Sequence, residues 1–200
     1  MKREQGLPAF GGARGDQGFT TIELLITIVI FSILLGLAIP GFARWLPNYR
    51  LRGAARDLYS NLQLAKTGSI KDRVEWAVRF TSADTYEVWS ALDPDSPDQN
   101  RGWNTFSTSD DTLIKTVTLS DYGSGVTFGA GSANSAAVTE GGGITNVFPA
   151  NPIYFNPRGF ATNNAEVYAY MTNNKGTAYA VGILASGAVV SKKWNNGQWE

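Results

Sequence analysis

An apolar stretch near the amino terminus, from Phe19 to Ile39, constrains this chain more than any other feature. At about 1.5 Å of rise per residue, a helix over this stretch is about 31 Å long and matches the hydrocarbon core of a bilayer. Its hydroxyl side chains can bond to carbonyl oxygens of their own helix. Glu23 is its one charged residue. Because an unpaired charge in a membrane costs roughly 2.5 to 3.5 kcal/mol, the sequence predicts a partner for this carboxylate.

Two simpler interpretations compete for the same stretch. The first is a single-pass anchor whose Glu23 reaches the lipid headgroup layer, where the positive end of the helix dipole favours a negative charge. The second is a secretory signal peptide, but its apolar region is usually about 7 to 15 residues long. The stretch in this chain is longer and contains Glu23, which argues against a signal peptide.

The run Gly18-Phe19-Thr20-Thr21-Ile22-Glu23 resembles the amino terminus of type IV pilins and type II secretion pseudopilins. The resemblance implies that a membrane-embedded prepilin peptidase and methyltransferase cuts between Gly18 and Phe19 and methylates the new amino group of Phe19. It also implies that Glu23 pairs with the terminal ammonium of a neighbouring subunit during assembly. Thr21 is a departure, because leucine is more usual there in the family.

The expected organisation has four parts. Residues 1–18 form a cytoplasmic leader peptide that is removed, residues 19–39 a transmembrane helix, residues 40–72 its amphipathic continuation, and residues 73–200 a β-rich head. Basic residues flank the span on both sides, so charge alone does not set its orientation. The resemblance implies a single pass through the bacterial inner membrane with the carboxyl-terminal domain in the periplasm, and a filament after assembly.

Helical spacing continues beyond the span. Apolar residues recur at intervals of three and four at Leu51, Ala55, Leu58, Leu62 and Ala65. Pro40 and Pro47 each lack an N–H group and crowd the carbonyl four residues back, so we expect a kink or local melting at Pro40. Pro47 repeats the problem and leaves open whether residues 40–50 are continuously helical.

From residue 74 the apolar period changes to two, which is typical of half-buried strands. Strands are expected at residues 74–80, 86–90, 113–119, 126–128, 153–155, 167–172, 179–184 and 188–194, with a long loop at 92–111. The last three strands would form an antiparallel meander. The predicted fold class is α+β, a pilin-like fold in which a long amino-terminal helix packs on an antiparallel β-sheet head.

Two further segments look like the H-type minor pseudopilin and FimT-type minor pilin family (GspH/FimT). The first is the helical stretch from Ala54 to Lys66, and the second is the turn that ends in Pro157-Arg158-Gly159. This resemblance implies a minor subunit of a type II secretion pseudopilus or type IV pilus. The implied partners are other pilin or pseudopilin subunits, the peptidase and the inner membrane, and a secreted substrate is left open.

Composition excludes much enzyme chemistry. The chain has no Cys and no His, so it offers neither a thiolate nor an imidazole, and its carboxylates show no acid and base pairing. We therefore predict a protein that is not an enzyme and that has no cofactor and no metal. With 17 basic and 17 acidic residues, the chain lacks the basic character of a nucleic-acid-coating protein.

Other residues support alternative interpretations. Lys192 and Lys193 lie beside Trp194 and Trp199, a cluster that could bind single-stranded DNA at a pilus tip by phosphate contact and stacking. DNA-binding FimT-type pilins carry a Gly-Arg-x-Arg motif that is absent after Gly187, so nucleic acid is not the expected partner. A membrane-anchored binding protein without a filament role is a third alternative.

An acidic loop and two aromatic residues also stay open. Asp93, Asp95 and Asp98 have the oxygen ligands that Ca²⁺ prefers, but Pro94 and Pro97 favour an ordinary solvated turn. In the same loop, Trp103 and Phe106 either cap the core or form a subunit contact.

Overall fold

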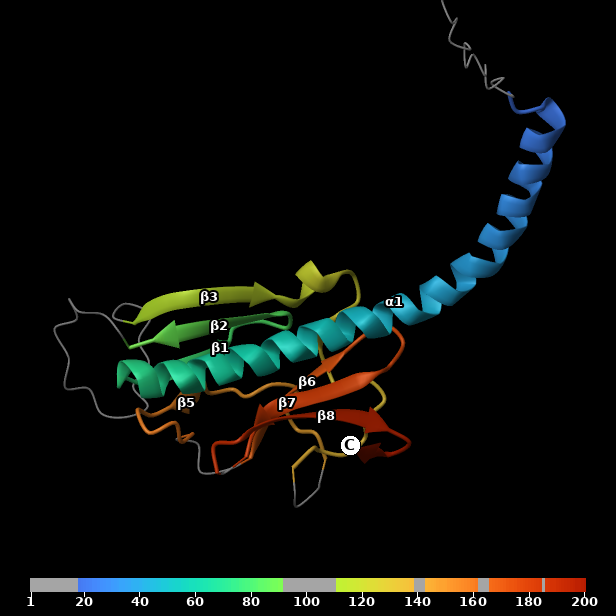
Figure 1. Cartoon of the computed structure of the whole chain (residues 1–200). Coiled ribbons are helices and arrows are strands. Elements are labelled where there is room, and N and C mark those ends of the chain that lie inside the picture. The colour runs from blue at the N-terminus through green and yellow to red at the C-terminus, as the bar shows by residue number, and fades with distance from the viewer. Residues whose placement is uncertain (1–17, 92–110, 139–142, 162–165, 185) are drawn as a thin grey trace, which may run out of the picture. The chain divides into compact units, whose positions relative to one another are not determined.

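The computed structural model describes residues 18–91, 111–138, 143–161, 166–184 and 186–200 (Figure 1). The chain divides into two compact units, Met1–Phe42 and Ala43–Glu200. A single helix, α1 (Thr21–Asp72), contributes to both of them. The predictions for the leader up to residue 17 and for the loop at 92–110, including its aspartates and aromatic residues, lie outside the described residues.

The helix α1 runs through Pro40 and Pro47 without interruption. Of the kink or local melting expected at Pro40, local melting does not occur, and the continuity of residues 40–50, which was left open, is present. A kink at Pro40 or Pro47 stays a prediction. Each proline removes one backbone hydrogen bond, and the helical turns on both sides hold the remaining ones. The helix ends at Asp72, and Arg73 takes a left-handed conformation with φ 58°, which turns the chain into the head.

The strands of the second unit form two antiparallel sheets. The first has the order β3-β2-β1-β5, and the second has the order β4-β6-β7-β8-β9. Their bounds are β1 Trp76–Phe80, β2 Thr85–Ser90, β3 Thr112–Thr118, β4 Thr127–Phe128, β5 Ile153–Phe155, β6 Val167–Thr172, β7 Ala178–Ile183, β8 Val189–Asn195 and β9 Gln198–Trp199. A short 3₁₀ helix, Leu119–Tyr122, follows β3.

The core of this unit lies where the carboxyl-terminal half of α1 crosses the two sheets (Figure 1). The helix contributes the apolar face that the sequence predicted, and Leu51, Leu58 and Leu62 are completely buried. Tyr86 from the first sheet and Ile183 from the second join the same cluster. One helix face therefore holds both sheets, and the predicted α+β class is confirmed.

The eight predicted strands are present with small differences at their ends, and β6, β7 and β8 form the predicted meander. The division into two sheets was not predicted, and neither was the short strand β9, which pairs with the end of β8 through Trp194 and Trp199. Strand order depends on contacts between segments far apart in the chain, which an apolar period of two does not encode.

Gly182 occupies a place in β7 where a side chain has no room. A Cβ atom built on it would lie 1.9 Å from the carbonyl oxygen of Val167 and 2.7 Å from the Cα atom of Tyr168. Both are backbone atoms of the paired strand β6, so relief requires the strands to separate. We expect Gly182→Ala to lower the free energy of unfolding by about 3 kcal/mol or more, measured by urea denaturation of the full chain in detergent.

Gly143→Ala is the matched control, because a Cβ atom there meets nothing within 4 Å. A Gly182→Ala protein as stable as the wild type would contradict the close approach of β6 and β7.

Tyr168 predicts a loss of stability at alkaline pH. Its side chain is buried, and its hydroxyl has no hydrogen-bond partner among the described residues. Burial, with a smaller contribution from the charge of Glu166, raises the pKa of Tyr168 to about 12. Because the unfolded chain loses this proton at a pKa of about 10, the stabilising contribution is complete below about pH 10 and is lost as pH rises towards 12.

We expect Tyr168→Phe to keep its stability near neutral pH and to lose less of it at alkaline pH than the wild type, by up to about 1 kcal/mol per pH unit. The measurement is urea denaturation over a pH series. Equal alkaline losses in the variant and the wild type would contradict the burial of this hydroxyl.

Candidate functional site

The amino end of α1 is organised around the carboxylate of Glu23. The Oε2 atom of Glu23 accepts hydrogen bonds from the backbone N–H of Thr20 at 3.0 Å and from its hydroxyl at 2.8 Å. The Thr20 Oγ1 atom in turn accepts a hydrogen bond from the backbone N–H of Glu23 at 3.3 Å. This reciprocal pattern is a capping box, which holds the carboxylate at the first turn of the helix.

Sequence reasoning missed the role of Thr20, although the Thr-x-x-Glu spacing before an apolar run was the available signal. The capping box satisfies hydrogen bonds of the carboxylate but leaves its charge uncompensated, since Thr20 is neutral. Among the described residues, none forms an ion pair with Glu23. These hydrogen bonds stabilise the carboxylate only in part. A cationic partner from outside this chain therefore stays a prediction.

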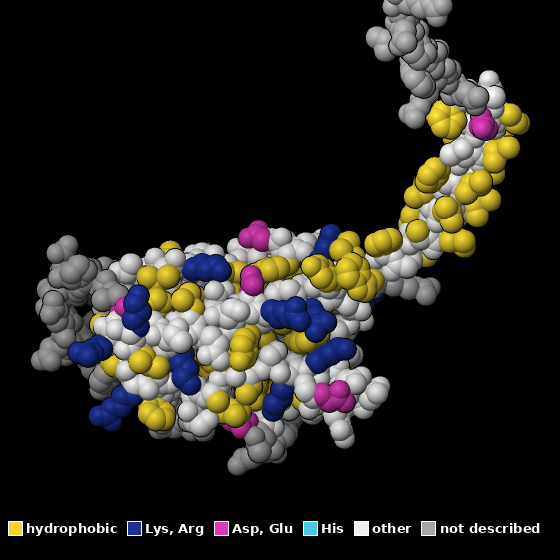
Figure 2. Space-filling view, in the orientation of Figure 1, with side chains coloured by type: hydrophobic (Ala, Val, Ile, Leu, Met, Phe, Trp, Pro, Cys, Tyr) yellow, Lys and Arg dark blue, Asp and Glu magenta, His cyan; other side chains and the backbone are white. Residues whose placement is uncertain are grey.

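The first unit exposes its apolar side chains. Every described side chain from residue 18 to residue 42 is exposed, and Phe19 is 89% exposed. Figure 2 shows this surface as a continuous run of apolar side chains along the helix. Among the described residues, α1 is the one helix long and apolar enough to cross a membrane. None of its most apolar stretch is buried. Such a surface requires lipid or other protein to cover it.

Two of the polar interruptions of this surface, Thr27 and Ser32, are satisfied within the helix, as predicted. The Thr27 hydroxyl donates to the carbonyl oxygen of Glu23 at 2.7 Å, and the Ser32 hydroxyl donates to that of Ile28 at 2.8 Å. Both side chains can therefore lie in an apolar environment without an unsatisfied donor. Among the groups that the structure describes here, Glu23 is the one whose charge remains.

The structure separates the two lysines that the sequence placed in one cluster. Lys192 donates to the carbonyl oxygen of Ala137 at 2.5 Å, and its Nζ atom lies 5.1 Å from the ring centroid of Tyr168. Lys193 is exposed and lines a groove on the other face of β8. Consecutive strand residues point to opposite faces, so the two cations do not act together. Nucleic-acid binding by this pair was an alternative to the expected function, and it stays untested.

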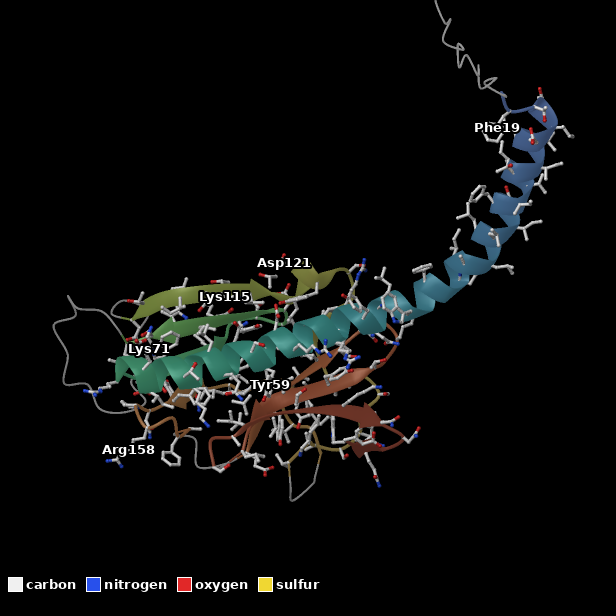
Figure 3. All side chains as sticks on the ribbon, in the orientation of Figure 1. Phe19, Tyr59, Lys71, Lys115, Asp121 and Arg158 are labelled. Atoms are coloured by element: carbon white, nitrogen blue, oxygen red, sulfur yellow. The ribbon has the colours of Figure 1, made fainter. Side chains whose placement is uncertain are left out.

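The side chains labelled in Figure 3 include Lys71 at the carboxyl end of α1 and Arg158 in the turn after β5. Arg158 is exposed, and its backbone N–H donates to the Asn156 side chain at 2.9 Å. Its expected place in a turn is confirmed. Gly159, with φ 76°, lies against Ile70 of α1 and ties this turn to the same end of the helix.

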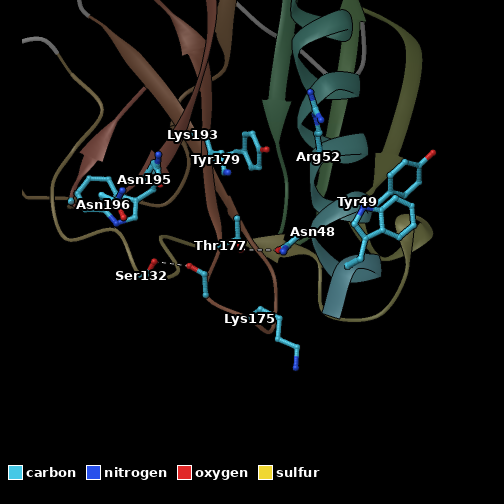
Figure 4. Close-up of a pocket in the computed structure, with 14 residues that line it drawn as sticks. Asn48, Tyr49, Arg52, Ser132, Lys175, Thr177, Tyr179, Lys193, Asn195 and Asn196 are labelled. Carbon is cyan, nitrogen blue, oxygen red and sulfur yellow. Dashed lines mark hydrogen bonds between the residues drawn. The ribbon is translucent and has the colours of Figure 1, made fainter. Parts of the chain in front are cut away.

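The groove that Lys193 lines is a feature that sequence reasoning missed. It is open, has a volume of about 750 Å³ and lies between α1 and the turns after β6 and β8 (Figure 4). Its cations are Arg52, Lys175 and Lys193, and no acidic residue is among its described lining. These three residues are far apart in the sequence, and only the fold brings them together.

The described residues contain no group of three or more His, Asp or Glu side chains able to hold a metal ion. The acidic loop with Asp93, Asp95 and Asp98 lies outside them.

The helix and head together define a class of protein. An exposed apolar helix with one carboxylate at its first turn, continued by a helix that packs on antiparallel sheets, is the architecture of a pilin-like subunit. The family model described as the prokaryotic N-terminal methylation motif matches residues 13–39, which include Gly18, Phe19 and Glu23. The model described as type II transport protein GspH matches residues 54–187, more than half of the chain. The chain belongs to the GspH family of minor pilins and pseudopilins.

The family consists of structural subunits that assemble with other pilin subunits, so the protein is a pilus or pseudopilus subunit. Among solved structures, the chain is similar to the type IV minor pilin FimU of Pseudomonas aeruginosa. The two are 11% identical with a TM-score of 0.48, and the match covers 78% of this chain and 96% of FimU. At these values the similarity adds nothing to the family assignment. The chain matches no curated protein.

Proposed function

We propose that the chain is a minor subunit of a type II secretion pseudopilus or type IV pilus, made as a precursor and processed after Gly18. Processing would leave Phe19 as an N-methylated first residue. The carboxylate of Glu23, held by Thr20 on an exposed apolar helix, is the observation that carries this proposal. A carboxylate so placed in a fibre interior is stable when the terminal ammonium of a neighbouring subunit lies against it.

The apolar surface of α1 would be covered first by lipid and later by neighbouring subunits. Before assembly, residues 19–39 would cross the inner membrane with the head in the periplasm, since lipid covers apolar side chains. After assembly, the helices of neighbouring subunits would replace the lipid. The peptidase and the other subunits are the partners that this cycle requires.

Fibre shearing tests the proposal. Cells that assemble abundant filaments are sheared, and the membrane and sheared fractions are probed for this chain. We expect a processed form in both fractions, in the sheared fraction at a low ratio to the major subunit. Finding the chain only in the membrane while filaments are abundant would overturn the filament role and favour the membrane-anchored alternative.

A further inference from the structure

We propose that the groove lined by Arg52, Lys175 and Lys193 binds the phosphate headgroups of anionic phospholipids while the subunit is stored in the membrane. This inference rests on the membrane-stored state of the proposed function. The site would retain the head at the lipid surface until the subunit is extracted into a filament.

The charge of the groove favours an anion. Arg52 projects from α1, Lys175 from the turn between β6 and β7, and Lys193 from β8, and all three are exposed. Among the described residues, none forms an ion pair with these side chains. Glu200 is the cross-strand neighbour of Lys193, since the backbone N–H groups of the two residues donate to each other's carbonyl oxygens at 2.7 and 2.9 Å. The Glu200 carboxylate accepts from the Asn195 side chain at 3.0 Å and offsets one of the three positive charges at most. The groove therefore keeps a net positive charge, which attracts phosphate.

The turn that carries Lys175 is bonded to α1 at Asn48. The Oδ1 atom of Asn48 accepts a hydrogen bond from the Thr177 hydroxyl at 2.8 Å (Figure 4). It also accepts one from the Asn173 side chain at 2.8 Å. The Oδ1 atom of Asn173 accepts from the backbone N–H groups of Lys175 at 3.0 Å and Thr177 at 3.2 Å. The Lys175 side chain therefore starts beside Asn48 of α1.

Asn48 lies only a few residues beyond the end of the uncharged stretch of α1. No charged residue occurs between Glu23 and Arg44. At 1.5 Å per residue, Asn48 lies about 14 Å along the helix from Ile39, where the expected span ends, and about 8 Å from Ala43, where the uncharged stretch ends, while the headgroup layer is about 5 to 8 Å thick. Because tilt shortens these distances along the membrane normal, Asn48 and the turn bonded to it lie at or just outside the headgroup layer.

The aromatic residues beside the groove support the same assignment. Trp45 and Tyr49 also line it, are 55% and 60% exposed, and stack with their ring centroids 4.8 Å apart. Tryptophan and tyrosine collect at membrane interfaces, because one part of each ring is apolar and another is polar. Rings and cations alternate from Arg44 to Arg52, which is the composition expected for a segment that lies in the headgroup layer.

A nucleic-acid strand fits these observations less well. Such a strand needs cations along an extended track with several stacking rings. Lys192, which would lengthen the track along β8, bonds to Ala137 on the other face. The cations of the groove are instead gathered around Asn48 and the turn bonded to it.

The test uses the full chain in nanodiscs that contain equal amounts of phosphatidylglycerol and phosphatidylcholine. Native mass spectrometry after partial lipid removal gives the ratio of the two lipids retained. The variant is Lys175→Gln with Lys193→Gln. The matched control is Lys71→Gln with Arg158→Gln, which removes the same charge from exposed residues at the other end of the helix. A third arm adds an oligothymidine strand.

We expect the wild type and the control to retain phosphatidylglycerol over phosphatidylcholine by about threefold or more, and the groove variant to show a ratio near one. An equal ratio in the wild type, or a preference that survives in the groove variant, would overturn the proposal. Groove-dependent binding of oligothymidine without any lipid preference would overturn it in favour of nucleic acid.

Alkali extraction of native membranes distinguishes a failure of the groove proposal from a failure of the proposed function. A chain that resists extraction but shows no lipid preference refutes only the groove. A chain that alkali releases from native membranes refutes the membrane-stored state, and the groove proposal fails with it.

Discussion

Replacing Glu23 with Gln is expected to leave precursor processing intact and to reduce incorporation into sheared filaments by about tenfold or more. The reason is that breaking one partner of a desolvated ion pair costs roughly 3 to 5 kcal/mol. Gln can still accept the bonds that Thr20 donates to Oε2, so this variant removes the charge with little change to the helix start. The measurement is an immunoblot of the membrane and sheared fractions.

Thr20→Val is the matched control, because it removes the hydroxyl of the capping box and keeps the charge. Losing one cap typically costs about 1 kcal/mol, so we expect a smaller defect than in Glu23→Gln. Normal incorporation of Glu23→Gln would contradict the ion pair. A defect in Thr20→Val as large as that of Glu23→Gln would show that helix capping matters as much as the charge.

Gly18→Val is expected to leave nearly all of the chain in the membrane as uncut precursor. A pilin-type cut requires a very small residue before Phe19, and a β-branched side chain would hinder entry to the peptidase. The substitution leaves the fold undisturbed, because a Cβ atom on Gly18 meets nothing within 4 Å. The change in mobility on a denaturing gel, compared with the wild type, measures this block.

Gly18→Ala serves as the control for size, and we expect it to be cut at least in part because a methyl group is small. A mature-sized product from Gly18→Val would contradict processing at this bond. A full block in both variants would indicate that the peptidase accepts glycine alone.

The helix and the strands could be predicted from the sequence because their signals are local. Leu51, Leu58 and Leu62 repeat with helical spacing, and the helix buries all three. The capping box of Thr20 and Glu23 is a local signal too, because Thr-x-x-Glu directly precedes the apolar run. The effect of the prolines could be predicted only in part, because the helical turns on both sides keep α1 continuous at Pro40 and Pro47.

The groove could not be predicted, because its parts meet only in the folded head. Lys193 was singled out with Lys192 as its neighbour in sequence, yet a strand directs consecutive side chains to opposite faces. The actual neighbours of Lys193 in the groove are Arg52 and Lys175, which come from other elements. The sequence positions of the basic residues do not show which of them share a groove. Strand register shows that Lys193 lies opposite Tyr179, which also lines the groove.

Mass spectrometry of the native amino terminus, on chain purified from cells that assemble filaments, tests the central claim most directly. The account predicts that the mature protein begins at Phe19 and carries one methyl group on its α-amino nitrogen, so that an ammonium is available for the Glu23 of a neighbouring subunit. A native chain that begins at any other residue, or one that keeps the leader in the assembled fibre, would contradict it.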